Sequence, residues 1–504
     1  MAAQSGDSEI LLVLLEAGAD INTSGGEHGS ALISAINEEE LECVKVLLKN
    51  NADPNLVGAE QQYPVHFATR KGLLDILKLL VDYGANLHVT CKNKLPLLLY
   101  ATVWNSAGVV NYLLKREGID INGRGPLAQT PLAMTTRLQR NFVRNILKRS
   151  PDVDCPDFKG TAPLMTVTQY GSVRLMTLLL EHKADLSKKD VHGRTTLYFA
   201  CRSPNVEAFE CISKALNGCD FATEHREMAV HATILANRPK LLSKILEDVS
   251  IRPNQADDHG WTPLYTASMY DRQELVFQLR IAGASEPRAR DALREKPSRW
   301  HPREKLPCFE YKPDGREVVM TEALKGPDLE GIEETYSTIK ADHPMIPIGK
   351  EGVYYFEIRI EVGSENGLFS IGFCEQDVGT AISLGKHCST WGYYGTNGKV
   401  STGHESDTDY GEPCNTGDVI GCGVNFVYHT AFYTKNGKVI RRAFSNVRGK
   451  LFPAVTMDAT SPGCQISAKF WSDRENDFCY KGELDAPATL EPPVNPTVTH
   501  SGPE

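Results

Sequence analysis

The sequence predicts a multidomain chain in which an α-helical solenoid precedes an all-β antiparallel sandwich. Two observations carry this prediction: aliphatic residues recur about every 33 residues up to residue 286, and apolar and polar residues alternate from about residue 308 onward. The chain has 504 residues, of which 41% are hydrophobic and 23% charged, so packed cores can form without disulfides or metal ions. Its net charge of −10 argues against nucleic acid as a partner.

Each repeat has an aliphatic anchor near its start. Each unit continues with a segment that ends in a leucine pair, and a glycine often follows, as at Gly18 and Gly84, where it supplies the left-handed residue that ends a helix. Several units place proline at the first helical position, as at Pro131 and Pro263, where the missing N–H costs no hydrogen bond. The pattern predicts stacked helical pairs. The anchors are Leu32, Val65, Leu98, Leu132, Leu164, Leu197, Val230 and Leu264.

This spacing, together with helix starts such as Thr262-Pro263-Leu264, resembles the ankyrin repeat. The resemblance implies about nine units over residues 1–286, the first of them incomplete. The weakest unit runs from about Ala222 to Asn254, because it has no Gly or Pro at the expected turn and Pro239 falls near its second helix. His66 and His231 stand at the signature histidine position, where the resemblance implies that the ring caps a turn.

The first unit keeps only its second helix, around Leu11 to Leu15, and its partner helix is almost wholly missing. Terminal repeats need a polar outer face, so we expect that the chain as written lacks further repeats or a separate upstream domain. Similar fungal proteins sometimes carry a NACHT nucleotide-hydrolysing module there, and the chain would then be a fragment of a larger signalling NTPase. The alternative is that an adapted short helix caps the array.

Residues 287–310 interrupt the repeat and form a basic linker. The expected role is a solvated linker or docking strap between two acidic domains, with nuclear import or an anionic partner as the alternative. The basic residues are Arg288, Arg290, Arg294, Lys296, Arg299, Arg303 and Lys305.

The sandwich is predicted over residues 311–480, followed by a disordered tail over 481–504. In Tyr354–Val362 apolar and charged residues alternate, which indicates a half-buried strand. Asn397-Gly398 and Asn436-Gly437 are typical hairpin turns. Six further strands are expected at Leu368–Cys374, Asp418–Phe426, Ala431–Thr434, Lys438–Arg442, Leu451–Met457 and Gln465–Phe470.

Several motifs here, among them Trp391-Gly392-Tyr393-Tyr394-Gly395 and Leu451–Val455, resemble the SPRY domain of the Ran-binding protein M type. Ankyrin repeats followed by SPRY form a fungal-like architecture. The resemblance implies that loops at one end of the sandwich bind short peptide segments. The departure is Lys469-Phe470-Trp471, which changes the end of the last strand. Candidate loops are Gly363–Gly367, Gln376–Tyr394 and Met457–Gly463.

No catalytic, cofactor-binding or metal-binding residues are expected, and the chain is predicted not to be an enzyme. Gly379–Lys386 has the wrong spacing for a phosphate-binding loop. Gly421-Cys422-Gly423 lies in a strand without the helix that a dinucleotide site needs. His404–Asp409 is interpreted as a solvated acidic loop, because triad residues must converge in space.

Large aromatic residues and arginines without a core role form the candidate binding surfaces, since such residues dominate interface hot spots. Each could instead pack on a neighbouring unit, and Tyr393 is assigned to the sandwich core. The array candidates are Arg70, Trp104, Phe158, Tyr170, Arg194, Arg202, Trp261 and Tyr270, and the sandwich candidates are Asn366, Trp391, Tyr394, Asp458 and Thr460.

The sequence therefore predicts an adaptor or scaffold that binds proteins or peptide segments through the array's concave face and the sandwich loops. A substrate-recognition subunit of a ubiquitin-ligase-type complex is the narrower alternative. The thirteen scattered cysteines lack C-x-x-C spacing, and no run reaches the roughly 18 apolar residues of a membrane span. We expect a cytoplasmic or nuclear protein; the sequence says nothing of its oligomeric state.

Overall fold

The computed structural model of the chain folds into two compact units. The first comprises Met1–Phe221 with Gly326–Ile332, and the second comprises Ala222–Lys325 with Glu333–Glu504. The residues that the structure describes are 2–25, 29–58, 62–216, 223–247, 252–285, 296–302, 309–321, 336–347, 352–362, 369–376, 378–379, 382–403, 407–458, 463–471 and 478–480.

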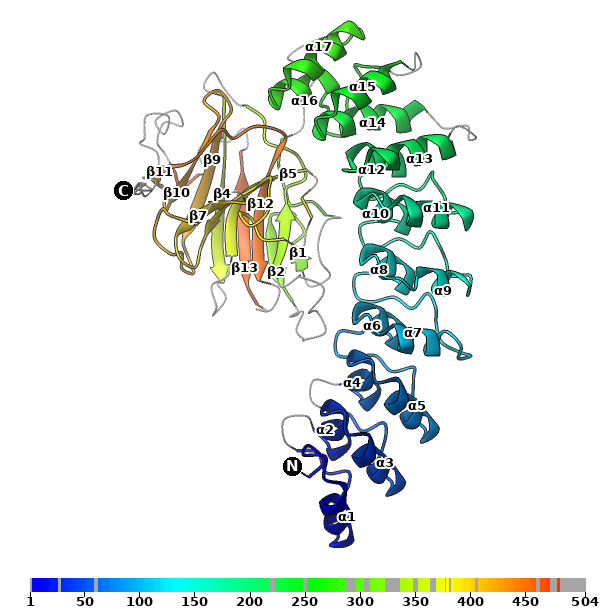
Figure 1. Ribbon diagram of the computed structural model, residues 1–504. Helices are drawn as coiled ribbons and strands as arrows, with labels where there is room; N and C mark the ends of the chain where they lie inside the picture. The colour runs from blue at the N-terminus through cyan, green and yellow to red at the C-terminus, as the bar shows by residue number, and fades with distance from the viewer. Residues whose placement is uncertain are drawn as a thin grey trace, which may run out of the picture. The chain divides into compact units, whose positions relative to one another are not determined.

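The first unit is built from short helices in consecutive pairs. The even-numbered helices from α2 to α12 form one layer and the odd-numbered helices from α3 to α13 form the other (Figure 1). The helices are α1 (Ser8–Glu16), α2 (Ala31–Asn37), α3 (Leu41–Lys49), α4 (Pro64–Arg70), α5 (Leu74–Asp82), α6 (Leu97–Val103), α7 (Ala107–Leu113), α8 (Pro131–Arg137), α9 (Val143–Leu147), α10 (Pro163–Tyr170), α11 (Val173–Glu181), α12 (Thr196–Arg202) and α13 (Val206–Leu216).

Local chemistry explains where these helices begin. The Ser30 hydroxyl accepts from the backbone N–H of Ile33 at 3.2 Å and caps α2. Nδ1 of His66 accepts from the backbone N–H of Tyr63 at 3.1 Å at the start of α4, which confirms the capping role that the repeat resemblance implies for this histidine. All eight aliphatic anchors are buried, from 0% exposed for Leu164 to 8% for Leu197, so each helical pair contributes to a packed core.

The second unit starts with four helices of the same kind: α14 (Thr223–Leu235), α15 (Pro239–Leu246), α16 (Pro263–Met269) and α17 (Gln273–Ile281). The unit that looked weakest in the sequence does form its helical pair. Pro239 is the first residue of α15, where a proline is compatible with the helix. Nε2 of His231 lies 3.0 Å from the carbonyl oxygen of Gln255, so this histidine also holds a turn.

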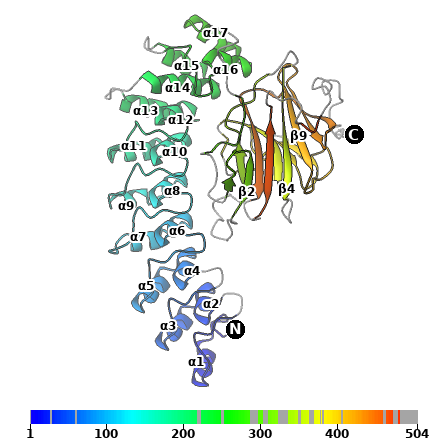
Figure 2. The same cartoon turned by 180° about the vertical axis from the view of Figure 1, so that it is seen from behind.

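Two antiparallel sheets complete the second unit (Figure 2). One has the strand order β1-β2-β13-β4-β9-β10-β11 and the other β3-β12-β5-β6-β7-β8. The β10–β11 turn has positive φ at Asn436 (51°) and Gly437 (78°), as predicted for a two-residue hairpin. The strands are β1 (Phe309–Tyr311), β2 (Glu317–Met320), β3 (Tyr336–Lys340), β4 (Val353–Val362), β5 (Phe369–Glu375), β6 (Thr390–Tyr394), β7 (Lys399–Thr402), β8 (Thr408–Asp409), β9 (Val419–Asn425), β10 (Thr430–Lys435), β11 (Lys438–Ser445), β12 (Leu451–Asp458) and β13 (Gln465–Phe470).

Strand β4 departs from the predicted half-buried pattern. Its residues from Val353 to Ile358 are all buried, including the charged Glu357, which was expected on the polar face, and its neighbour Tyr355. The ring of Phe478 lies 5.2 Å from that of Tyr355, and the backbone N–H of Tyr480 donates to the Glu357 carboxylate at 2.9 Å. Residues 478–480 therefore cover the outer face of β4, which no local periodicity could show.

The sandwich also extends further toward the N-terminus than residue 311. Trp300 is fully buried, its ring lies 5.3 Å from Phe470, and its Nε1–H donates to the carbonyl of Arg316 at 2.9 Å. The Ser298 hydroxyl donates to Asp342 at 2.8 Å. Part of the segment expected as a linker is thus packed into the sandwich, because an indole of that size gains more from burial than from exposure.

Candidate functional site

Four of the array candidates in the first unit lie at the C-terminal end of a first helix. Arg70, Tyr170 and Arg202 are the last residues of α4, α10 and α12, and Trp104 is the residue that follows α6. We call these four residues the helix-end rim. Because the units repeat the same geometry, Arg70 and Arg202 occupy one repeat position, five residues after their anchors, and Trp104 and Tyr170 occupy the next position along the helix.

Two rim residues of neighbouring units contact each other. The guanidinium carbon of Arg70 lies 5.9 Å from the Trp104 ring centroid and 5.2 Å from that of Phe67, which is within cation–π range. Trp104 is partly buried against a cluster that includes Tyr100. Tyr170 is 48% exposed, far more than a packing residue needs. The rim therefore combines an anchored pair with an exposed aromatic side chain.

Three further array candidates, Phe158, Arg194 and Trp261, lie on the loops that precede first helices, and these loops share one construction. An aspartate accepts hydrogen bonds from the backbone N–H groups two and four residues ahead, as Asp157 does from Lys159 and Thr161, both at 2.9 Å. Asp190 and Asp257 make the same pair of bonds. Burial raises the pKa of Asp157 despite these bonds, so keeping the Asp157 carboxylate charged in this loop costs folding free energy.

The loop candidates Phe158 and Arg194 have contacts within their own loops. The Lys159 ammonium lies 5.3 Å from the Phe158 ring centroid, and Phe158 remains half-buried. Nε of Arg194 is 2.6 Å from Oδ2 of Asp190, with both side chains largely buried. Arg194 therefore neutralises its own loop, which is a structural role rather than the exposed contact that its position suggested.

In the second unit, a lysine of the sandwich reaches the third aspartate loop. Nζ of Lys450 lies 2.6 Å from Oδ2 of Asp257, and the two side chains are only 1% and 7% exposed. Nζ is also 2.9 Å from Nδ1 of His259. We call this contact the joint. Burial by itself raises the pKa of Asp257, but the charges of Lys450, His231 and His259 outweigh it, and the net pKa is lowered.

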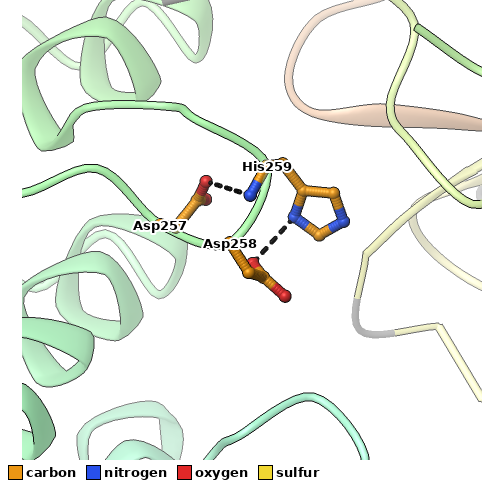
Figure 3. A group of neighbouring side chains, drawn as sticks. All are labelled: Asp257, Asp258 and His259. Atoms are coloured by element: carbon orange, nitrogen blue, oxygen red, sulfur yellow. Dashed lines mark hydrogen bonds and ion pairs between the residues drawn. The ribbon is translucent and has the colours of Figure 1, made fainter. Parts of the chain in front are cut away.

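Asp257, Asp258 and His259 bring three potential metal ligands close together (Figure 3). Asp257 accepts from the backbone N–H of His259 at 3.0 Å, and Nδ1 of His259 lies 2.9 Å from Asp258. The Lys450 ammonium lies against two of these three side chains and supplies the positive charge that a metal ion would bring. The cluster is therefore part of the joint.

The neighbours of Lys450 extend the joint over α16. Arg448 pairs with Asp271, and the backbone N–H of Gly449 donates to the carbonyl of Met269 at 3.2 Å. Gly449 has φ +102°, and a Cβ there would lie 2.5 Å from the Tyr270 ring. Glycine is required at this position because of both its backbone conformation and this close approach.

The joint changes the interpretation of two array candidates. Trp261 is 1% exposed, and the Lys450 ammonium lies 5.5 Å from its ring centroid. Tyr270 is half-buried beside Gly449 and Arg272, the latter with its guanidinium 4.6 Å from the ring centroid. Trp261 was expected on an exposed binding surface and is instead buried; both residues contribute to a contact inside the chain.

The strand register assigns the sandwich loops to two ends. Leu451 pairs with Glu375 near the joint, and Met457 pairs with Phe369 at the opposite end. Loops Gly363–Gly367 and Met457–Gly463 both follow strands that finish at this opposite end. Gln376–Tyr394 instead leaves β5 at the joint end. The strands that lead into Gly363–Gly367 and Met457–Gly463 therefore finish at one end of the sandwich, and the strand that leads into Gln376–Tyr394 finishes at the other.

Among the sandwich candidates, Trp391 is half-buried and stacks on Phe373 at 5.1 Å, and Tyr394 is 9% exposed with the Lys386 ammonium 5.1 Å from its ring centroid. Tyr393 is fully buried, which confirms its assignment to the core. Asn366 and Thr460 lie outside the described residues, as does the Asp458 side chain.

The glycine pair in β9 has a packing explanation. A Cβ on Gly421 would lie 1.9 Å from the Tyr355 hydroxyl, and one on Gly423 would lie 2.3 Å from the Phe432 ring. The glycines thus make room for aromatic side chains of the neighbouring strands. This packing explains the glycine pair, so its partial resemblance to a dinucleotide fingerprint does not indicate a dinucleotide site.

Sequence reasoning did not find the joint. Asp257 had a detectable signal, because an aspartate followed by glycine three residues later recurs at Asp157 and Asp190. Lys450 had none, because a single lysine in a turn carries no pattern and its partner is distant in sequence.

The chain combines repeated helical pairs, which carry an aromatic and arginine rim, with an antiparallel sandwich. This combination is typical of proteins that bind other proteins. A protein-family model of ankyrin repeats (3 copies) matches residues 32–124 and 133–225. A model of the SPRY domain matches residues 353–470. The chain is an ankyrin-repeat protein with a C-terminal SPRY domain of the Ran-binding protein type.

Curated relatives match a limited part of the chain. The Ran-binding proteins 9/10 homolog of Drosophila melanogaster is 36% identical over 141 residues, which are 28% of this chain and 14% of that relative. Ran-binding protein 9 of Homo sapiens is 36% identical over 134 residues, 27% of this chain and 18% of the relative. Dual specificity protein kinase splA of Dictyostelium discoideum is 30% identical over 161 residues, 31% of this chain and 6% of the kinase. The chain therefore spans less than a quarter of each relative's length.

Among solved structures, the human ASB11 ankyrin repeat domain is similar, with a TM-score of 0.37 and 22% identity, covering 42% of this chain and 95% of that domain. Within the described residues, no helix is both long and apolar enough to cross a membrane.

Proposed function

We infer that this protein is an adaptor or scaffold, in which the helix-end rim of the array binds one protein and the loops at the opposite end of the sandwich bind a peptide segment of another. The observation that carries the proposal is the rim itself. Arginine and aromatic residues recur at the C-terminal ends of several first helices, and these residue types carry most of the binding energy in protein interfaces.

The joint supports a division of labour between the two surfaces. It engages residues 448–450 of the sandwich with the last helical pair, so that end of the sandwich is already committed to a contact. The loops Gly363–Gly367 and Met457–Gly463 follow strands that end on the other side. A peptide could therefore bind there without displacing the joint.

A substrate-recognition subunit of a ubiquitin-ligase-type complex is a narrower form of the same proposal, in which the held peptide belongs to a degradation target. The proposal also includes a cytoplasmic or nuclear setting. The described cysteines form no disulfide, which fits a reducing compartment. Binding at equilibrium is the whole mechanism, and no bond is made or broken.

Affinity capture with the full chain tests the proposal. Arg70→Ala combined with Tyr170→Ala should remove one set of captured proteins, and Asn366→Ala combined with Thr460→Ala should remove a different set. Tyr83→Ala is the matched control, because Tyr83 is a 41% exposed tyrosine that follows the second-layer helix α5, away from the rim. Loss of the same proteins by both variants would contradict the existence of two surfaces.

A further inference from the structure

One stretch of the first unit has a charge opposite to that of the chain. Residues 121–151 contain no Asp or Glu, although the chain has a net charge of −10. This basic stretch covers α8 and α9 and the turns around them. Its basic residues are Arg124, Arg137, Arg140, Arg144, Lys148 and Arg149.

A pocket of about 180 Å³ opens beside this stretch, between the α8–α9 turn and helix α11. Three of its lining residues are arginines, Arg140, Arg144 and Arg174, and none is acidic. Its other polar residues, Gln139, Asn141 and Ser172, can all donate hydrogen bonds. Two adjacent repeat units therefore contribute cations and donors to one concave site.

Among the described residues, no acidic side chain pairs with the cations of this pocket. In the described part of the chain, the guanidinium groups of Arg144 and Arg174 have no hydrogen-bond or ion-pair partner. Arg140 donates to the carbonyl of Val103 at 3.4 Å, while its Nε is buried without a partner among the described residues. Buried donors that lack an acceptor destabilise a fold, so this arrangement calls for an anion.

Helix polarity points the same way. Arg174 is the second residue of the nine-residue helix α11, where the positive end of the helix dipole disfavours a cation. The equivalent second residue is acidic in other second helices, Glu42 in α3, Asp75 in α5 and Glu207 in α13. The charge is therefore reversed where the pocket lies, and a bound anion would turn an unfavourable helix start into a favourable one.

We propose that this pocket binds a phosphate monoester, the phosphorylated side chain of a partner protein. A carboxylate would offset only one of the three guanidinium charges, whereas a phosphate monoester carries about −1.5 to −2 charges and three acceptor oxygens at neutral pH. Planar guanidinium groups match phosphate oxygens with two parallel hydrogen bonds each. The site uses neither the rim nor the sandwich loops, so the proposal does not depend on the adaptor function.

The test is a ³¹P NMR titration of N-acetyl-phosphoserine-amide with the full chain at low salt, with inorganic phosphate and N-acetyl-glutamate-amide as comparison ligands. Arg144→Gln and Arg174→Gln should each weaken phosphoserine binding by roughly 10- to 100-fold, as expected for the loss of a charged hydrogen-bond partner. Arg144→Lys keeps the charge but loses the planar fork, so its affinity should fall between the wild type and Arg144→Gln.

Lys148→Gln is the matched control, because it removes a cation of the same helical unit that does not line the pocket. It should change the affinity less than about twofold. The thermal midpoints of the Arg144 and Arg174 variants should equal or exceed that of the wild type, since a cation leaves a helix start. A lowered midpoint would mean that the arginines support the fold.

The order of affinities among the ligands identifies what the pocket binds. Tighter binding of the phosphoserine derivative than of inorganic phosphate supports a phosphorylated side chain, and the reverse order identifies free phosphate and overturns the partner assignment. Equal binding of the glutamate derivative would overturn the choice of phosphate. Equal losses in Lys148→Gln and Arg144→Gln, or binding of duplex DNA with the same sensitivity, would show a diffuse basic surface instead of a pocket.

Discussion

Replacing Lys450 with methionine removes the ammonium group from the joint and leaves an unbranched apolar side chain that is one atom shorter. In the wild type this group lies 2.6 Å from the Asp257 carboxylate, with the two side chains 1% and 7% exposed. The substitution leaves a buried carboxylate without its cation. Loss of one partner of a buried pair costs about 3–5 kcal/mol.

The structure places Lys450→Met at the lower end of that range, about 3 kcal/mol. Asp257 keeps its two hydrogen bonds from the backbone N–H groups of His259 and Trp261, both 3.0 Å. Asp157 has the same two-bond loop, and burial raises its pKa. Without Lys450, the pKa of Asp257 should rise in the same way.

The stability lost in Lys450→Met should depend on pH. In the wild type the lowered pKa of Asp257 contributes stability above the carboxyl pKa of an unfolded chain, and this contribution is lost as the pH falls through the folded pKa. In Lys450→Met the raised pKa makes the folded state bind the proton more readily, so acidification favours it. The deficit of the variant should therefore shrink as the pH falls from 7 toward about 4.

Urea unfolding of the full chain, followed by tryptophan fluorescence, measures the effect, since Trp261 lies beside Lys450. Unfolding of two units is not one transition, so the midpoint of the second unit is compared among variants. Lys450→Met, Asp257→Asn and the double variant should show a coupling of about 2 kcal/mol. Lys399→Met is the control: its partner Asp409 is 91% exposed at 3.4 Å, and such surface pairs contribute about 0–1 kcal/mol. Equal costs at positions 450 and 399 with no coupling would refute the joint.

Three further outcomes are expected. Leu164→Ala should lower the unfolding free energy of the first unit by about 2–5 kcal/mol, because Leu164 is fully buried, and an unchanged thermal midpoint would show that it is not. Burial lowers the pKa of His66 to about 4 from 6.5, so the first unit should lose about 3 kcal/mol as the pH falls from 6.5 to 4 in urea titrations. His66→Gln should flatten this dependence, while the exposed control His88→Gln should leave it as it was. Gly449→Ala should open the joint, because its Cβ would meet the Tyr270 ring at 2.5 Å, and limited proteolysis with the wild-type pattern would contradict this.

Features that repeat or alternate in the sequence were predictable. The anchors from Leu32 to Leu264 are all buried, because repeats of 33 residues bury their apolar side chains by stacking on their neighbours. Strand β12 was predicted at Leu451–Met457 and runs over Leu451–Asp458, because a continuous apolar run bounded by turns has few alternatives.

Contacts between segments that are distant in the sequence were not predictable. The burial of Tyr355 and Glu357 depends on residues 478–480, which have no periodic pattern. Trp261 looked like an exposed hot spot because the loop geometry is the same in every unit, and only Lys450 distinguishes its surroundings. Arg194 could have been recognised, since Asp190 stands four residues before it and such pairs contact each other locally.

The central claim is that one chain holds two proteins at the same time. Sequential capture tests it directly. A protein that the Arg70→Ala and Tyr170→Ala variant fails to capture is tagged and pulled down. The eluate of this pull-down is then searched for a protein that the Asn366→Ala and Thr460→Ala variant fails to capture. The full chain should bring the second protein down with the first, and either double variant should break that link. Absence of the second protein when the full chain is present, or its presence without the chain, would contradict the account.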